Sequence, residues 1–397
     1  MDGVGLSPAR RAGHGVLLPT GRMSDEFRTV LQRRGDEVRL GLVGDLHALD
    51  QRYAIAARAA AGHDVQLLCA VKASTHHEVL RRAAHAGLGF DVANARELAH
   101  VRAVAPSAKV SLTSPALPIG DLELLYEAFG RGEVQRWHCD SLGQLERLVR
   151  ACPGSTVGVR VNLDGLAVPE GMPLYRPSRF GIRLDQLGVA RDLAAAHGCR
   201  LRWVHAHNGS EENDTASYVF AAGQILAAAR QSDLDLESLD LGGGLLLEPT
   251  VEAIGGFCEA VRQATGPDVE LVLEPGRFWL TDCISLVTQV LDVKETLDQL
   301  LLVLDFGMMS HLQWSDFLRI PTLGRLAPDD PRPWRICGRS CFEEDMLDEW
   351  EVVPVAPEGT VPVVGDCMVL GNVSGYSIEL SCDFNGVERP SVDFLIP

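Results

Sequence analysis

A lysine follows an apolar run in "LLCAVKAS", residues 68–75, where a buried strand is expected. Lysine is scarce in this chain, which has three, at positions 72, 109 and 294, and it is almost never buried without a reason. An amine that is desolvated at the end of an apolar strand is partly neutral and can attack a carbonyl group to form a Schiff base. Lys72 is therefore the first candidate for covalent chemistry.

Polar residues also follow the other apolar runs of the first 280 residues. They are Asp91, Arg160, His205, His207, the glycines 242–244 and the stretch "EPGR" at 274–277. Glycine amides and an arginine suit a phosphate group. A Schiff-base lysine with a phosphate site points to pyridoxal phosphate, whose ring nitrogen needs a partner such as the carboxylate of Glu274. Taken singly, an aspartate can also be a helix cap and three glycines a tight turn.

These residues must be positioned by elements that alternate along the chain. The strand-like runs are 65–71, 89–93, 110–113, 134–138, 156–163, 201–207, 236–241 and 269–273. Segments with helical spacing lie between them, one of them opened by Ser141 as an N-cap. Eight such units predict an α/β fold, a (β/α)8 TIM barrel over residues 43–279, whose active site lies at the carboxyl ends of the strands.

The sequence pattern changes after about residue 280, where short β-like runs alternate with proline-rich loops. We expect a second, C-terminal β-domain of the β-sandwich or β-barrel kind, made of residues 280–397 together with 1–42. The longest irregular stretch within the barrel is 164–181, and loops of that length often bind ligands.

Composition excludes several classes of protein. The 397 residues carry a formal net charge of −18, which argues against nucleic acid or an anionic membrane as partner. No run of about 18 apolar residues predicts a membrane span, and the first 23 residues lack the core of a signal peptide. Ten cysteines without a CxxC pair argue against a zinc ribbon and for reduced thiols in the cytoplasm.

A metal-dependent hydrolase is the main rival at this point. His205 and His207 stand two residues apart on one predicted strand, so their side chains would point to the same face. No third and fourth ligand is evident, and that interpretation leaves Lys72 and the glycines without a use. We therefore expect no metal.

Taken in order, the motifs resemble those of the fold-type III pyridoxal-phosphate decarboxylases, the family that includes the diaminopimelate, ornithine and arginine decarboxylases. The resemblance runs roughly from residue 45 to residue 390. The matching stretches are AVKAS, GFDVANARE, SRFGI, HAHNGS, LDLGGG, EPGR, GRSCFEED, GD, GYS and FNG. It implies a pyridoxal-phosphate-dependent amino-acid decarboxylase that works as a homodimer, with active sites at the subunit interface.

The resemblance also implies roles for single residues. Lys72 would hold the cofactor covalently, His207 would stack on its ring and Glu274 would pair with the ring nitrogen. Cys341, delivered by the partner subunit, would be the candidate proton donor. The other implied cofactor contacts are Asp91, Arg160, Ser210, Gly243, Gly244, Gly276, Arg277 and Tyr376.

The motifs depart from the family on the side that would face the substrate. Phe342 stands where the ornithine and diaminopimelate enzymes carry an acidic residue, and a buried phenylalanine cannot pair with an ammonium group beyond a weak cation–π attraction. Gln313 with Trp314 replaces an Arg-Pro pair, and Arg179 and Arg339 replace the usual Lys and Pro. The candidate substrate contacts are Phe342, Gln313, Arg179 and Asp345.

These departures predict an amino acid with a bulky or apolar distal group, or an amino-acid conjugate, in specialised metabolism. The stretch "DFGMMSHL" resembles the corresponding stretch in a branch of the family that acts on such conjugates in siderophore and antibiotic pathways. Two alternatives stay open: an amino-acid racemase on the same scaffold, and a non-catalytic relative that regulates by forming heterodimers.

Overall fold

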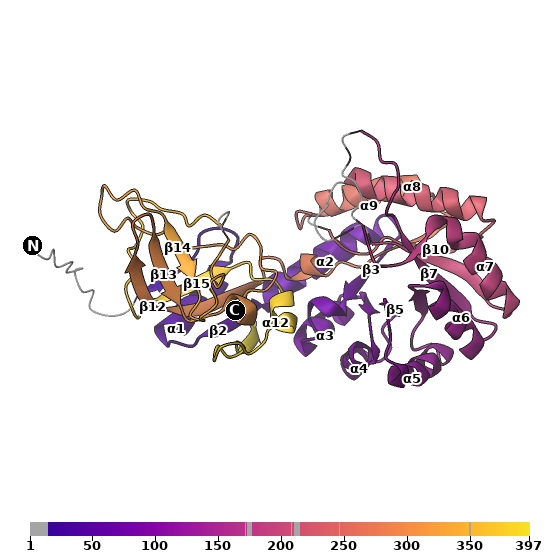
Figure 1. Ribbon diagram of the computed structural model, residues 1–397, viewed down its shortest axis with the longest axis horizontal. Coiled ribbons are helices and arrows are strands. Elements are labelled where there is room, and N and C mark those ends of the chain that lie inside the picture. The colour runs from indigo at the N-terminus through magenta and orange to yellow at the C-terminus, as the bar shows by residue number, and fades with distance from the viewer. Residues whose placement is uncertain are drawn as a thin grey trace, which may run out of the picture. The chain divides into compact units, whose positions relative to one another are not determined.

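The computed structural model describes residues 15–170, 172, 177–207, 209, 215–245, 247–348 and 351–397. They divide into two units, which Figure 1 shows in one ribbon. The barrel unit comprises Ala48–Trp279, and the sheet unit comprises the residues up to His47 together with Leu280–Pro397. The barrel unit begins at Ala48 rather than at residue 43. In the described part of the chain, no helix is long and apolar enough to cross a membrane.

The barrel unit contains the closed parallel sheet that the alternating pattern predicts. Its strands are β3 (Val65–Ala70), β4 (Gly89–Val92), β5 (Val110–Ser114), β6 (Arg136–Cys139), β7 (Thr156–Asn162), β9 (Arg200–His205), β10 (Ser238–Asp240) and β11 (Glu270–Leu273). They pair in the order β6-β5-β4-β3-β11-β10-β9-β7, and β6 also pairs with β7, which closes the ring. The short β8 (Ile182–Arg183) adds to β7. The predicted TIM barrel is confirmed.

Helices connect these strands and surround the barrel (Figure 1). They are α2 (Leu46–Ala61), α3 (His77–His85), α4 (Ala95–Val104), α5 (Ile119–Gly130), α6 (Leu142–Ala151), α7 (Leu187–Ala196), α8 (Thr215–Gln231) and α9 (Val251–Thr265). Side-chain caps set where several of them begin. Ser141 accepts from the backbone amide of Gln144 at 3.1 Å, as expected. At α4, Asn94 accepts from the amide of Glu97, whose carboxylate accepts from the amide of Ala93.

The sheet unit joins strands from both ends of the chain. Its elements are β1 (Val16–Leu17), α1 (Asp25–Asp36), β2 (Gly41–Asp45), β12 (Ile284–Glu295), β13 (Leu300–Leu304), α11 (Met308–His311), β14 (Trp334–Cys337), β15 (Cys367–Gly371), α12 (Tyr376–Leu380) and β16 (Val392–Leu395). The strands form one connected seven-stranded sheet in the order β1-β15-β12-β13-β14, with β2 between β12 and β16. The long β12 pairs first with β2 and β15 and then, past an irregularity between Val290 and Asp292, with β13.

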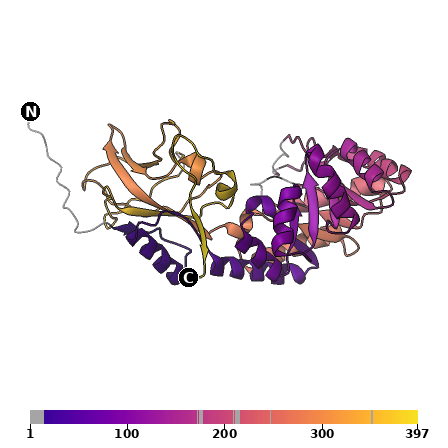
Figure 2. The same ribbon diagram turned by 90° about the horizontal axis from the view of Figure 1, so that it is seen from below.

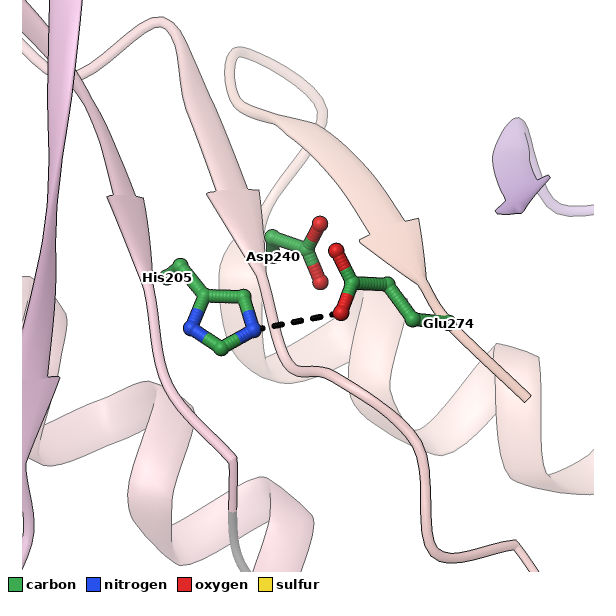
Figure 3. A group of neighbouring side chains, drawn as sticks. All are labelled: His205, Asp240 and Glu274. Carbon is green, nitrogen blue, oxygen red and sulfur yellow. Dashed lines mark hydrogen bonds and ion pairs between the residues drawn. The ribbon is translucent and has the colours of Figure 1, made fainter. Parts of the chain in front are cut away.

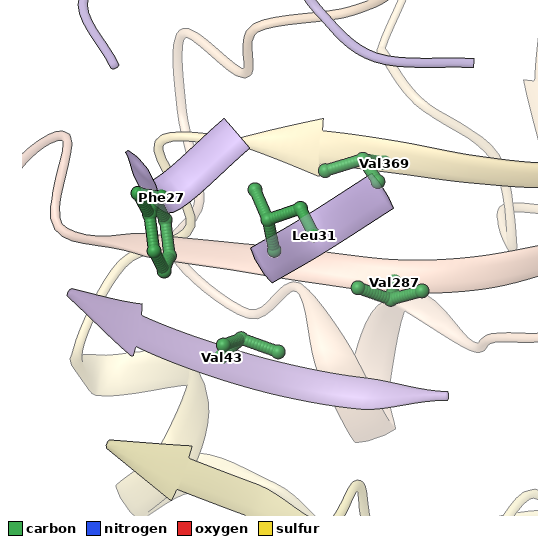
Figure 4. Close-up of a cluster of buried hydrophobic side chains, with 5 residues drawn as sticks. All are labelled: Phe27, Leu31, Val43, Val287 and Val369. Atoms are coloured by element: carbon green, nitrogen blue, oxygen red, sulfur yellow. The ribbon is translucent and has the colours of Figure 1, made fainter. Parts of the chain in front are cut away.

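The core of the sheet unit lies under α1, the indigo helix along one face of the sheet in Figure 2. Phe27 and Leu31 stand four residues apart on this helix and so share one of its faces. They pack against Val43 of β2, Val287 of β12 and Val369 of β15, and all five side chains are at most 1% exposed (Figure 4). Burying each of them contributes about 1.5–3 kcal/mol. The segment before the barrel is thus part of the core of this unit.

Candidate active site

Lys72 lies in a 3₁₀ turn, η1 (Val71–Ala73), that directly follows β3. Its Nζ is 3.9 Å from Oδ2 of Asp91 on β4, and the side chain of Lys72 is 49% exposed in the barrel unit, against 3% for Asp91. The expectation of a desolvated lysine is therefore wrong for this unit by itself. Lys72 lies in the turn after the strand and not in the strand itself. The residues of β3 are therefore mostly buried, whereas the amine of Lys72 is half-exposed. Burial raises the pKa of Asp91 well above its ordinary value.

The glycines after β10 form a tight loop against two neighbouring segments. Gly242 and Gly244 have φ angles of +67° and +94°, which side chains rarely adopt. A Cβ on Gly243 would lie 2.4 Å from the carbonyl oxygen of Glu274, and one on Gly244 would lie 2.1 Å from that of Gly209. The hydroxyl of Tyr218 on α8 donates to the carbonyl of Gly243 at 2.7 Å. The loop needs glycine at these positions, both for the positive φ angles and for the close neighbouring carbonyls.

His207 lies beside this loop. The backbone amide of Gly243 donates to its Nδ1 at 3.2 Å, which leaves the proton of the neutral ring on Nε2. Burial lowers the pKa of His207 to about 3, so its ring is neutral at physiological pH. His205 contacts a different group, the carboxylate of Glu274. The two histidines therefore do not form the paired site that the hydrolase interpretation needs.

Glu274 directly follows β11, and its carboxylate points toward two other buried groups, His205 and Asp240 (Figure 3). Its Oε2 is 3.2 Å from Nε2 of His205. His205 and Asp240 are register partners on β9 and β10, and register partners in a parallel pair point to the same side of the sheet. This shared register is what brings the two side chains to Glu274.

The charges at Glu274 depend on its neighbours. Burial raises the pKa of Asp240 well above its ordinary value, and the facing Glu274 adds to the effect. Burial alone would also raise the pKa of Glu274, but the charge and hydrogen bond of His205 and a hydrogen bond with Asp240 hold it below its ordinary value. Burial lowers the pKa of His205. Of the two carboxyl groups, that of Glu274 is therefore the more readily ionised.

His138, Asp140 and Asp240 belong to this region and are not among the residues selected from the sequence. His138, on β6, is fully buried, and its Nδ1 lies 3.2 Å from Oγ1 of Thr113. Its ring is 5.4 Å from that of His205. "WHCD" and "LDLGGG" end strands just as the selected motifs do, so the same rule applied to every strand end would have found them.

Two arginines meet on one phenylalanine at the carboxyl end of β7. The guanidinium carbons of Arg160 and Arg179 lie 4.4 and 4.2 Å from the ring centre of Phe180. Arg160 also pairs with Asp140 at 3.6 Å. Within the described parts of the chain, no carboxylate forms an ion pair with Arg179. The charge of Arg179 nevertheless acts on the carboxyl of Asp140, whose pKa it lowers against the larger, opposite effect of burial.

The "EPGR" turn links β11 to its neighbours. The amide of Ala70 donates to the carbonyl of Pro275, and the amide of Trp279 donates to that of Gly276. Arg277 begins the short helix α10 (Arg277–Leu280). Ser210 lies outside the described residues.

The remaining selected residues lie in the sheet unit. Cys341 is exposed, although its sequence alone suggests a small buried hydrophobe, and its backbone amide donates to Oδ1 of Asn385 at 2.6 Å. Asp345 is 5% exposed. Its two carboxylate oxygens accept from the backbone amides of Met308 at 2.7 Å and Ser340 at 2.9 Å. Asp345 thus holds the loop that carries Cys341.

Aromatic side chains line the same unit near these loops. Phe342 is 42% exposed, so it is not the buried phenylalanine expected, and its ring is 6.3 Å from that of Phe384. The rings of Trp314 and Tyr376 are 5.2 Å apart. The side-chain amide of Gln313 donates to the carbonyl of Met309, within its own turn.

Comparison with known proteins agrees with this arrangement. The family described as "Pyridoxal-dependent decarboxylase, pyridoxal binding domain" matches residues 46–281. A diaminopimelate decarboxylase of Neisseria meningitidis serogroup A is 26% identical over 340 residues, 81% of each chain. A lysine/ornithine decarboxylase of Selenomonas ruminantium is 26% identical over 337 residues, 80% of each. The structure of the Paramecium bursaria Chlorella virus arginine decarboxylase bound to agmatine has a TM-score of 0.76 at 19% identity, covering 94% of this chain and all of that one.

Proposed function

Because the chain belongs to the family of pyridoxal-dependent decarboxylases, we propose that it removes the α-carboxylate of an amino acid whose distal end is not a simple ammonium group. The observation that supports the proposed distal end of the substrate is the exposed aromatic pair of Phe342 and Phe384, where an acidic residue would be expected at position 342. An aromatic surface accepts an apolar or conjugated group far better than a hydrated ammonium.

The residues of the barrel unit fit pyridoxal phosphate. Glu274 offers a buried carboxylate whose oxygens each have two lone pairs, so that it can accept from a protonated ring nitrogen in addition to its neighbours in the chain. Gly243 and Gly244 carry no side chains, so a phosphate could approach the backbone of this loop closely. His207, neutral and held by Gly243, would lie flat on the ring. Asp91, Arg160, Ser210, Gly276 and Arg277 would complete the contacts from this unit. Tyr376, a residue of the sheet unit, is the further contact that the resemblance implies.

The mechanism divides the work between cofactor and chain. When bound, pyridoxal phosphate supplies the electron sink for the electrons of the broken Cα–carboxylate bond. Lys72 would hold the cofactor through its side-chain amine. Glu274, kept ionised, would keep a proton on the ring nitrogen. The Sγ of Cys341, from the partner subunit of a homodimer, would return a proton to Cα.

The setting proposed for this reaction is the cytoplasm, in specialised metabolism. All ten cysteines are free thiols, which suits a reducing compartment. Two subunits would be needed if Cys341 serves the neighbouring active site.

The first experiment is the visible spectrum of the purified protein before and after borohydride, with Lys72→Ala as the control. We expect a cofactor band that borohydride abolishes and that the variant lacks. Carbon dioxide release is then compared between amino-acid conjugates and the diamino acids ornithine, lysine and diaminopimelate. Comparable turnover of diaminopimelate would rule out the proposed substrate class. A protein that stays colourless with added cofactor would favour the regulator, and racemisation without carbon dioxide release would favour the racemase.

A further inference from the structure

Two carboxyl groups face one another at the bottom of the active site, those of Asp240 and Glu274 (Figure 3). Asp240 is 0% exposed and Glu274 is 3% exposed. One oxygen of each, together with a ring nitrogen of His205, lie within 4.8 Å of one another. Oδ2 of Asp240 and Oε1 of Glu274 are both buried and have no hydrogen-bond partner. Unpaired buried polar atoms are costly, and two of them side by side point to a missing proton.

We propose that Asp240 is protonated at neutral pH and donates a hydrogen bond from Oδ2 to Glu274, which stays ionised. A proton placed there satisfies both unpaired oxygens at once. It also avoids two buried negative charges at short range, an arrangement that carboxyl pairs relieve by sharing one proton.

The surroundings decide which of the two carries the proton. Glu274 accepts from Nε2 of His205 through its other oxygen, and the positive groups that face it, Lys72 and Arg160, favour its ionised form. The other oxygen of Asp240 accepts only a neutral donor, the backbone amide of Gly242 at 2.8 Å. Burial raises the pKa of Asp240, and the negative charge of Glu274 adds to this effect.

Asp240 is thereby a positioning residue, because it acts on the cofactor through Glu274. With donors on both sides, His205 and Asp240, the carboxylate of Glu274 is fixed in place and keeps its charge for the ring nitrogen. This consequence rests on the proposed function. The location of the proton does not, and it is tested separately on the full-length protein with and without pyridoxal phosphate.

The test uses the matched pair Asp240→Asn and Glu274→Gln, because an amide imitates a protonated carboxyl and not an ionised one. Thermal and urea unfolding are followed between pH 5 and pH 8. Because the folded wild type keeps a proton on Asp240 that the unfolded chain releases, the wild type loses stability as the pH rises above the ordinary pKa of aspartate. The ratio of the folding equilibrium constant of Asp240→Asn to that of the wild type should therefore rise by up to about tenfold per pH unit.

Glu274→Gln should behave in the opposite way. In the wild type, the ionised Glu274 stabilises the folded state at any pH above the ordinary pKa of glutamate, and the variant lacks this contribution. The variant should therefore be less stable than the wild type between pH 5 and pH 8, and the difference should shrink only under acid conditions. The groups that titrate nearby, Asp91, His138 and His205, are common to all three proteins. Asp240→Ala, which neither titrates nor donates, should show the same pH-dependent gain over the wild type as Asp240→Asn. Its stability should be lower than that of Asp240→Asn at every pH, because the hydrogen bond to Glu274 is lost.

An infrared difference spectrum supplies a direct readout. The C=O stretch of a protonated carboxyl should be present in the wild type at neutral pH and reduced in Asp240→Asn. The reverse pattern, with Asp240→Asn unfolded or unstable and Glu274→Gln tolerated, would put the proton on Glu274 and overturn the proposal. Equal tolerance of both amides would also overturn it. If the proton is found on Asp240 but the cofactor band is absent, the proposed function fails and the inference stands.

Discussion

Asp345 shows how a motif position and its contacts can point to different roles. It stands near Cys341 in "SCFEED", where the resemblance suggests contact with substrate. Yet both of its oxygens accept backbone amides, those of Met308 and Ser340, and a Cβ on Gly338 would lie 2.4 Å from its carboxylate. We therefore attribute to it the shape of the Cys341 loop rather than a direct contact.

Replacing Asp345 with alanine should destabilise the sheet unit by about 2–4 kcal/mol, because two part-buried backbone amides lose their buried, charged acceptor. Urea unfolding monitored by the fluorescence of Trp334, a buried residue of this unit, measures the change. Asp329→Ala, at an exposed position of the same unit, is the matched control and should stay within about 0.5 kcal/mol of the wild type. Equal effects from the two variants would contradict the role given to Asp345.

At the scale of elements, the loop of Gly242–Gly244 is the most constrained segment of the site. Its backbone contacts the end of β11, the segment around Gly209 and the hydroxyl of Tyr218. A side chain added anywhere along it must move one of these neighbours. The loop is therefore a rigid part of the cofactor site, made of backbone rather than of side chains.

Gly244→Ala should lower cofactor affinity by at least about tenfold and stability by about 2 kcal/mol, because its Cβ would meet the carbonyl of Gly209 and its φ is positive. The intensity of the cofactor band during titration with pyridoxal phosphate measures the affinity. Gly223→Ala is the control, since Gly223 lies within α8 with open space around it. That change should leave affinity alone and stabilise the protein by up to about 1 kcal/mol. A Gly244→Ala protein that binds like the wild type would show that the phosphate lies elsewhere.

The elements themselves could be predicted well, and the site less completely. Buried parallel strands such as Val65–Ala70 are nearly continuous apolar runs, and Ser141 is a strong N-cap, so both are visible locally. The half-exposed state of Lys72 depends on a single 3₁₀ turn, which no apolar pattern encodes. The convergence of His138, His205 and Asp240 depends on register between strands far apart in sequence.

On the scale of the whole molecule, the exposed Cys341 and the half-exposed Lys72 fit the homodimer proposed above. Lys72→Ala and Cys341→Ala should each be nearly inactive alone. Co-expressed with two different tags, they should recover about a quarter of wild-type activity, since half of the random dimers are mixed and each mixed dimer has one intact site. Purification on both tags isolates the mixed dimer for assay. Mixed dimers without activity would show that each subunit supplies its own cysteine.

The discontinuity of the sheet unit also dictates an order of events during synthesis on the ribosome. β1 pairs with β15, and β2 pairs with β12 and β16, so the early strands have no partners until the ribosome has translated the whole barrel. Phe27, Leu31 and Val43, which are fully covered in the finished unit, stay open to other chains for that interval. The barrel, whose strands all fall within one stretch of sequence, can fold first. The nascent chain therefore needs protection at its beginning while its middle is already folded.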